Sequence, residues 1–191
     1  MKNSNQKGFT LIEIAIVMVI IGLLLGGVLK GQELINNAKI KALYAMKDQM
    51  ASAYLTYYDR YNAYPGDDAN ATTNVGATAN GNGDGLIATT DFDCTATGTG
   101  TESCDAYEHL RLANLISGNS FDNPTNPYGG SVSVAQATYS GKATHWVQFQ
   151  NIPGGVGQIL DRKYDDGVDS TGAIRADAAY GDDLIQLYME M

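Results

Sequence analysis

The residues from Phe9 to Leu29 form an apolar run that contains one charged side chain, Glu13. At ~1.5 Å per residue in a helix, these 21 residues match the ~30 Å hydrocarbon thickness of a bilayer. A secretory signal peptide has a shorter apolar core followed by a small-x-small cleavage site, and this run shows neither feature. The sequence therefore predicts a membrane-spanning helix near the N-terminus.

Glu13 is the unusual residue of this run, because a carboxylate at membrane depth is costly unless it is paired. No Lys or Arg lies within the run. Cleavage between Gly8 and Phe9 would create an α-amine on Phe9, about one helical turn from Glu13. In two staggered copies of the chain, the carboxylate of one could instead meet the amine of the next. We therefore expect the partner of Glu13 to be an amine made by processing.

The stretch KGFTLIE, residues 7–13, followed by the apolar run, resembles the N-terminus of type IV pilins and of the pseudopilins of type II secretion. The resemblance implies that prepilin peptidase cuts between Gly8 and Phe9 and methylates the new amine of Phe9. It implies that Glu13 promotes assembly with other pilin or pseudopilin subunits on an inner-membrane assembly platform. It also implies a single-pass protein of the bacterial inner membrane, with a cytoplasmic leader and a periplasmic head.

Helical periodicity continues beyond the membrane segment, because apolar residues recur every three or four positions from Ile35 to Tyr61. Pro65 and Gly66 then end the helix. We expect a leader at 1–8, a transmembrane and filament-core helix at 9–30, its amphipathic continuation at 31–64, and an α+β head with long loops at 65–191. Many major pilins have Pro at the place of Lys30, so the resemblance favours a minor pilin or a pseudopilin.

The head is expected to contain strands at Ser131–Thr138, Thr144–Gln150 and Leu184–Met189, where apolar and polar residues alternate. Helices are expected at Asp105–Ile116 and Val156–Lys163. The fold class is therefore α+β, a long N-terminal α-helix packed on a small antiparallel β-sheet head, as the pilin resemblance implies.

Three kinds of side chain in the head and the helix carry further expectations. Trp146 should anchor the sheet. His109 and Arg111 should lie on the wetter side of their helix. Four tyrosines recur at helical spacing, and packing of the helix on the sheet explains them better than ligand stacking does. These are Tyr54, Tyr57, Tyr58 and Tyr61.

Residues 66–105 are expected to form a long loop, and one part of it resembles an EF-hand calcium loop. Asn80, Asn82, Asp84 and Asp91 stand where oxygen ligands belong, and Leu86 stands where a backbone carbonyl binds. Asp67 could add a carboxylate. The alternative is a Gly/Asn turn with solvated acids, which is also expected for Asp67 and Asp68. The acidic turn at 165–169 is a weaker metal candidate, with a solvated turn as its alternative.

Charge and cysteine content narrow the function further. From Asp67 onward the chain carries 17 Asp and Glu against 5 Lys and Arg, and such a surface repels nucleic-acid phosphates. No direct nucleic-acid binding is expected. Cys94 and Cys104 predict a disulfide in an exported protein, and two free thiols are the alternative in the cytosol.

Two functions of different classes remain open at this stage. The first is a structural subunit, a minor pilin or pseudopilin. The second is a single-pass, membrane-anchored module that binds calcium or another ligand and never assembles. No arrangement of residues typical of a catalytic site accompanies His109 or His145, so we do not expect an enzyme.

Overall fold

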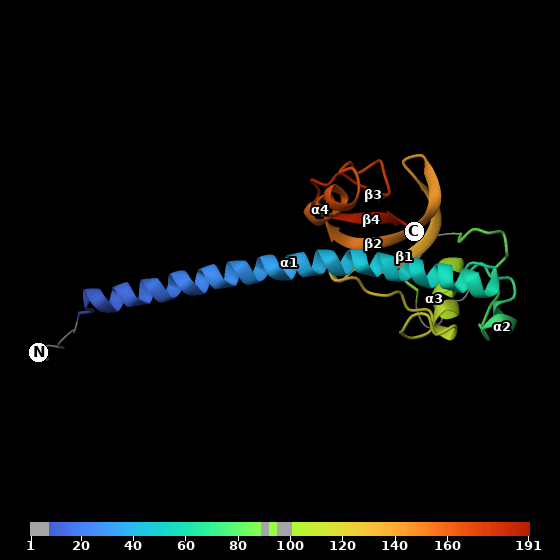
Figure 1. Ribbon diagram of the computed structural model, residues 1–191, viewed down its shortest axis with the longest axis horizontal. Helices are drawn as coiled ribbons and strands as arrows, with labels where there is room; N and C mark the ends of the chain where they lie inside the picture. The colour runs from blue at the N-terminus through green and yellow to red at the C-terminus, as the bar shows by residue number, and fades with distance from the viewer. Residues whose placement is uncertain (1–7, 89–91, 95–100) are drawn as a thin grey trace, which may run out of the picture. The chain divides into compact units, whose positions relative to one another are not determined.

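The first element of the computed structural model is α1, a helix that runs from Leu11 to Tyr61 (Figure 1). The structure describes residues 8–88, 92–94 and 101–191. The chain divides into two compact units, with the boundary between Lys39 and Ile40, and each unit is described by itself. The helix ends at Tyr61, as predicted, because Pro65 disfavours helical backbone at Tyr64.

In the first unit, the side chains of α1 are exposed along the apolar run, from Leu11 to Leu29. An 18-residue window of α1 reaches a mean hydropathy of 2.7, and none of it is buried. By length and composition, α1 can cross a membrane. An apolar surface of this kind needs lipid or other protein around it, since water solvates it poorly.

In the second unit, residues 40–61 of α1 contribute one face to the hydrophobic core of the head. Leu43, Met50, Tyr54 and Tyr57 are buried there, and Tyr58 is more than a third exposed. Tyr54 and Tyr57 confirm the expected packing role of the tyrosines. Tyr58 and the partly buried Tyr61 reach the border of the core instead.

A four-stranded antiparallel sheet forms the centre of the head, in the order β1-β2-β4-β3 (Figure 1). β1 (Val132–Tyr139) and β2 (Lys142–Pro153) form a hairpin. Ser140 and Gly141 join these two strands with φ of 47° and 83°, as a two-residue turn of the type I′ class requires. β4 (Leu184–Glu190) lies between β2 and the short β3 (Ile174–Ala176).

The alternation of strand residues divides the sheet into two faces. One face, with Val147, Phe149 and Leu187, joins α1 in the main core. The other face carries Trp146, whose side chain is fully buried. Its Nε1 donates to Ala137 O at 3.0 Å, and the guanidinium carbon of Arg175 lies 5.6 Å from its ring centroid. Trp146 is therefore an anchor of the sheet, as predicted.

Three helices complete the head: α2 (Ala71–Asn74), α3 (Glu102–Leu112) and α4 (Gly154–Tyr164). α3 begins three residues before the predicted start and ends four residues before the predicted end. α4 matches its prediction within two residues. α2 and β3 were not predicted, because elements of three or four residues are too short to show a periodic pattern.

The expected solvent exposure of His109 is wrong. His109 is fully buried, like the other residues of α3 from Ser103 to Leu110. Its Nδ1 accepts a hydrogen bond from Gly66 N at 2.9 Å, and its Nε2 lies 3.3 Å from Ala79 O. The segment from Gly66 to Ala79 covers this side of α3, and helical periodicity in α3 cannot reveal a loop that packs on it.

The expected solvation of Asp67 and Asp68 is also wrong. Their residues are 3% and 1% exposed. The Asp68 carboxylate accepts hydrogen bonds from Tyr57 Oη (2.9 Å), Asn74 Nδ2 (2.8 Å) and Asn70 N (2.8 Å). A buried carboxylate requires such donors, because burial without them costs several kcal/mol. The Gly-rich composition suggested a solvated loop. The hydrogen-bond donors that the fold brings to Asp67 and Asp68 make their burial possible.

Gly66 offers a direct test of this loop packing. Its φ is +91°, and a Cβ there would lie 2.1 Å from Glu102 O, whereas Gly76, at φ +76°, has open space around it. Both Gly→Ala changes incur the left-handed strain of ~1 kcal/mol. We expect Gly66→Ala to lower the free energy of unfolding by about 3 kcal/mol or more, since backbone must also move.

The measurement is thermal and urea unfolding of the full chain in detergent, with Gly76→Ala as the matched control. Equal losses in the two variants would show that the contact between Gly66 and α3 is not formed.

Candidate functional site

The first turn of α1 contains a reciprocal set of hydrogen bonds between Thr10 and Glu13. Thr10 N and Thr10 Oγ1 each donate to Glu13 Oε2 at 2.8 Å, and Glu13 N donates to Thr10 Oγ1 at 3.3 Å. This is a capping box, in which a Thr at the N-cap and a Glu three residues later satisfy free donors of the first helical turn. Glu13 therefore has partners within its own chain.

Thr10 was not among the residues predicted to have a functional role. The pattern Thr-x-x-Glu before an apolar run is a known signature of a capping box, so the signal was present. The structure changes the expectation that a processed amine is the sole means of pairing Glu13. It leaves open a further bond to an amine, because a carboxylate has about four acceptor positions.

Gly8 and Phe9 lie just before α1, outside regular secondary structure, and both are exposed. A peptidase needs an extended, accessible peptide bond, which a hydrogen-bonded helix does not provide. The Gly8–Phe9 bond is accessible and lies outside the helix, and the cap at Thr10 begins the helix directly after it.

An exposed Gly–Phe step, a capped helix and a membrane-length apolar surface together fit a protein with an N-terminal membrane anchor. Residues 3–29 match the family described as the prokaryotic N-terminal methylation motif. This motif is the signature of type IV pilin and pseudopilin precursors, and it confirms the resemblance at the N-terminus. Neither the curated proteins nor the solved structures contain a match to this chain.

The match covers the N-terminal segment, so the head is described from its own structure. A long N-terminal apolar helix with a small antiparallel sheet is a pilin-like α+β architecture, and it confirms the predicted fold class. The motif and the fold therefore agree on a pilin-like or pseudopilin precursor.

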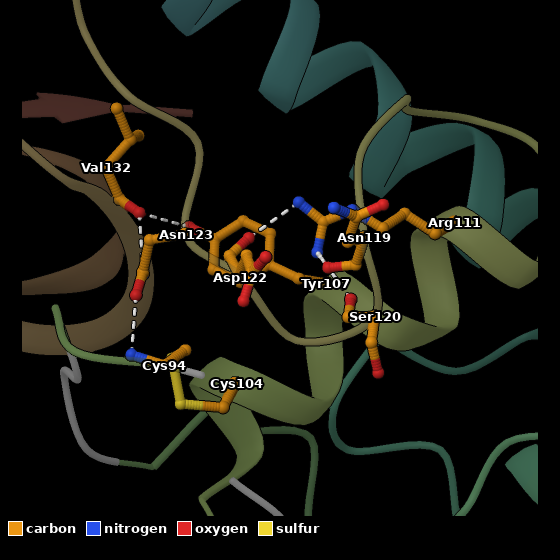
Figure 2. Close-up of a disulfide and its surroundings, with 9 residues drawn as sticks. All are labelled: Cys94, Cys104, Tyr107, Arg111, Asn119, Ser120, Asp122, Asn123 and Val132. Atoms are coloured by element: carbon orange, nitrogen blue, oxygen red, sulfur yellow. Dashed lines mark hydrogen bonds between the residues drawn. A yellow bond between two sulfur atoms is a disulfide. The ribbon is translucent and has the colours of Figure 1, made fainter. Parts of the chain in front are cut away.

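The predicted disulfide between Cys94 and Cys104 is confirmed (Figure 2). Both cysteines are buried, and Cys104 lies in the first turn of α3. Cys94 N donates to Asn123 Oδ1 at 2.7 Å, and Asn123 Nδ2 donates to Val132 O at 2.9 Å. The bridge therefore connects residue 94, α3 and the start of β1 into one framework.

Arg111 organises the chain that follows α3 (Figure 2). Its guanidinium donates to the backbone carbonyls of Ser117, Asn119, Ser120 and Asp122. These bonds satisfy carbonyls that no strand or helix pairs. Arg111 is half-buried, so its predicted position on the wetter side of α3 is only partly met.

The oxygen atoms of the EF-hand-like segment accept hydrogen bonds from nearby backbone. Asn80 Oδ1 accepts from Thr72 N, Asn82 Oδ1 from Asp84 N, and Asp84 Oδ1 from Leu86 N, at 2.8–2.9 Å. These bonds resemble the turns that Asn and Asp make in any tight loop. Asp91 lies outside the described residues. The calcium site at Asn80–Asp91 therefore stays a prediction.

Asp67 reaches this segment, as expected, but it meets backbone N–H groups there. Oδ1 accepts from Gly83 N (2.7 Å) and Asp84 N (3.0 Å), and Oδ2 accepts from Gly85 N (2.8 Å). Asp67 thus holds the glycine-rich turn in place.

Within the described ranges, three carboxylates gather at the acidic turn after α4. Oxygens of Asp161, Asp165 and Asp166 lie within 4.8 Å of one another and could hold a metal ion. Asp161 is fully buried and accepts from Tyr180 Oη (2.7 Å) and Gly167 N (3.0 Å). Burial raises the pKa of Asp161, while a hydrogen bond from Thr171 lowers the pKa of the exposed Asp166. Asp165 and Asp166 belong to the acidic turn that was predicted as a weaker metal candidate, whereas Asp161, which lies in α4, was not predicted to take part.

Burial lowers the pKa of His109, against the smaller opposing effects of Ala79 O, Asp68 and Glu108. Below pH ~6.5 the unfolded chain therefore binds a proton that the folded chain excludes, so stability falls as the pH falls. We expect the melting temperature to drop between pH 7.5 and 5.5, with a slope of at most ~1.4 kcal/mol per pH unit for one proton. Protonation would also remove the acceptor of Gly66 N.

The measurement is thermal melting of the full chain in detergent across this range, with His109→Gln as the test variant. This variant should flatten the pH dependence. His145→Gln is the comparison variant: burial also lowers the pKa of His145, so this change should remove a second, separate part of the slope, and the double variant should be flatter than either single variant. An unchanged slope in His109→Gln would contradict the assignment.

Proposed function

We propose that the protein is a minor pilin or a pseudopilin, a structural subunit of a type IV pilus or a type II secretion pseudopilus. The observation that supports this most is the methylation motif over residues 3–29, which continues into the exposed apolar surface of α1. A surface of this length is stable in a bilayer before assembly and against other subunits after it. In this role the protein is not an enzyme.

In this proposal, prepilin peptidase cuts between Gly8 and Phe9 and methylates the amine of Phe9. The carboxylate of Glu13 then meets the amine of a neighbouring subunit while Thr10 holds it in position. The capping box orients the carboxylate at the start of the helix, so the neighbouring amine finds it ordered. Thr10 is thus a positioning residue for assembly.

The proposed location is the bacterial inner membrane, with residues 1–8 as a cytoplasmic leader, residues 9–30 as the membrane segment and the head in the periplasm. Residues 31–64 extend the helix and residues 65–191 form the head. A disulfide persists in an oxidising compartment, which supports a periplasmic head. The partners are other subunits, prepilin peptidase and the inner-membrane assembly platform.

The helix supports a minor pilin or pseudopilin over a major pilin. α1 continues through Lys30, the place where many major pilins carry Pro. Proline would kink the helix there.

The second candidate is a single-pass module that binds calcium and does not assemble. The observation that favours it is the gathering of Asp161, Asp165 and Asp166 at one turn. Carboxylate oxygens are the ligands that calcium prefers. Calcium is compatible with the first candidate as well, as a structural ion of the head.

Processing and assembly give the decisive experiment. Gly8→Val should leave a full-length, unmethylated membrane protein that does not enter filaments, because the peptidase requires the small residue at the cut. Gly22→Ala is the matched control, since a Cβ at Gly22 meets nothing in the chain. Mass spectrometry of membranes and of sheared filaments gives the readout. Filaments that contain the Gly8→Val protein would refute the proposed processing.

The same assay separates the two candidates through Glu13. Glu13→Ala should reduce filament incorporation strongly, whereas Thr10→Ala should reduce it less, because the cap contributes only ~1 kcal/mol and the carboxylate remains. A non-assembling module would show no effect of either change.

Calcium binding is tested by melting the full chain in detergent with calcium or with a chelator. A weak site of the extracellular type, with a dissociation constant of ~10⁻⁴–10⁻³ M, should raise the melting temperature at 10 mM calcium, about 10–100 times that constant. Asp84→Asn and Asp166→Asn then indicate which segment binds. Identical midpoints with calcium and chelator would remove calcium from both candidates.

A further inference from the structure

A cavity of about 430 Å³ lies at the C-terminal end of α1, within the head. Three tyrosines line it, Tyr58, Tyr61 and Tyr64, and so do the buried residues Asp67 and Asp68. A volume of this size suits a small molecule. Neither the disulfide framework nor the acidic turn after α4 contributes to it, and assembly through α1 residues 9–30 does not use it.

The tyrosines give the cavity aromatic walls. The rings of Tyr58 and Tyr64 pack on each other with centroids 4.8 Å apart, Tyr64 also packs on His145 at 4.7 Å, and Tyr61 packs on the buried Tyr57 at 4.6 Å. Tyr58 is 39% exposed, so part of its surface is open to a ligand. The face of an aromatic ring carries negative electrostatic potential and attracts a cation within about 6 Å of its centroid.

Asp67 and Asp68 bear negative charge in this wall. Every hydrogen bond described above to their carboxylates comes from an N–H or O–H donor, so both act as acceptors, as ionised carboxylates do. None of the ion pairs in residues 8–88, 92–94 and 101–191 includes either aspartate. Two adjacent buried charges therefore have neutral donors around them.

The lining residues of the cavity give it a negative potential. Asp67 and Asp68 are the two charged residues among them, and none of them is Lys or Arg. Burial lowers the pKa of His109 and of His145, so these two imidazoles are neutral near pH 7. A cation in the cavity would relieve this excess of negative charge.

The hydrogen bonds of the two aspartates select the kind of cation. Calcium binds through six to eight inner-sphere oxygens, and a primary ammonium needs acceptors for three N–H groups. The carboxylate oxygens of Asp67 and Asp68 already accept six bonds from the fold, so only about two of their eight acceptor positions remain, fewer than either cation needs. A quaternary ammonium donates no N–H bond and requires only aromatic faces and negative potential.

We propose that the cavity lined by Tyr58, Tyr61 and Tyr64 binds a small organic cation with a quaternary ammonium group, such as choline, against the exposed part of Tyr58. The acidic surroundings also set its specificity. A ligand that joins the ammonium to an anion, as phosphocholine and glycine betaine do, brings its negative charge into a cavity whose lining has no Lys or Arg. Free cationic choline therefore binds better than either of these ligands, and better than a phosphocholine lipid headgroup.

The test uses the full chain in a maltoside detergent, which carries no choline group. Isothermal titration measures binding of choline, of phosphocholine and of 3,3-dimethyl-1-butanol, the neutral isostere of choline. Calcium chloride is titrated in parallel. We expect saturable binding of choline, with the isostere and phosphocholine each weaker by about tenfold or more.

Two variants locate the site. Tyr58→Leu removes a ring face and keeps apolar volume, so choline affinity should fall about tenfold, whereas Tyr58→Phe keeps the face and should bind like the wild type. Circular dichroism verifies that both variants fold. Absence of choline binding, equal affinity for the isostere, or unchanged affinity in Tyr58→Leu would overturn the proposal. Binding of calcium in place of choline would overturn it as well.

Discussion

The head depends on buried carboxylates that satisfy the backbone of a segment with little regular structure. Residues 62–88 contain one short helix, so most of their N–H groups need partners outside a helix or sheet. Asp67 accepts from three successive N–H groups, at Gly83, Asp84 and Gly85, and His109 accepts from Gly66. The bond to His109 holds the segment on α3, and the bond from Tyr57 to Asp68 holds it on α1. Asp67 and Asp68 are buried beside the cavity because the segment packs in this way.

At the N-terminus a different constraint governs the structure. The apolar side chains of α1 must leave water, while the first turn of the helix presents N–H groups without intrahelical partners. Thr10 and Glu13 satisfy part of this need in one capping box. Glu13 therefore serves the helix of its own chain, and the proposed role in assembly would use a carboxylate that the helix already holds.

Sequence patterns predicted the elements that are long and periodic. The end of α1 followed from Pro65, the three long strands from alternation, and the disulfide from an isolated pair of cysteines in a protein with a membrane segment. Burial of His109, Asp67 and Asp68 could not be predicted, because it depends on a loop that packs on α3 from another part of the chain. Asp161 was missed for a similar reason, since its role depends on Tyr180, 19 residues away.

The errors and the proposed cation site have one origin. Asp residues in a Gly-rich stretch suggest solvated turns. In a solvated turn, water and salt would screen the charges of Asp67 and Asp68. In the fold, Asp67 and Asp68 are buried and accept hydrogen bonds from N–H and O–H groups. These donors are uncharged, so they do not neutralise the two carboxylates. The donors occupy six of the about eight acceptor positions of the two carboxylates, which disfavours calcium, while the negative potential remains and favours a cation that needs no oxygen ligand. The chemistry of the cavity is thus a consequence of how this segment satisfies its own backbone.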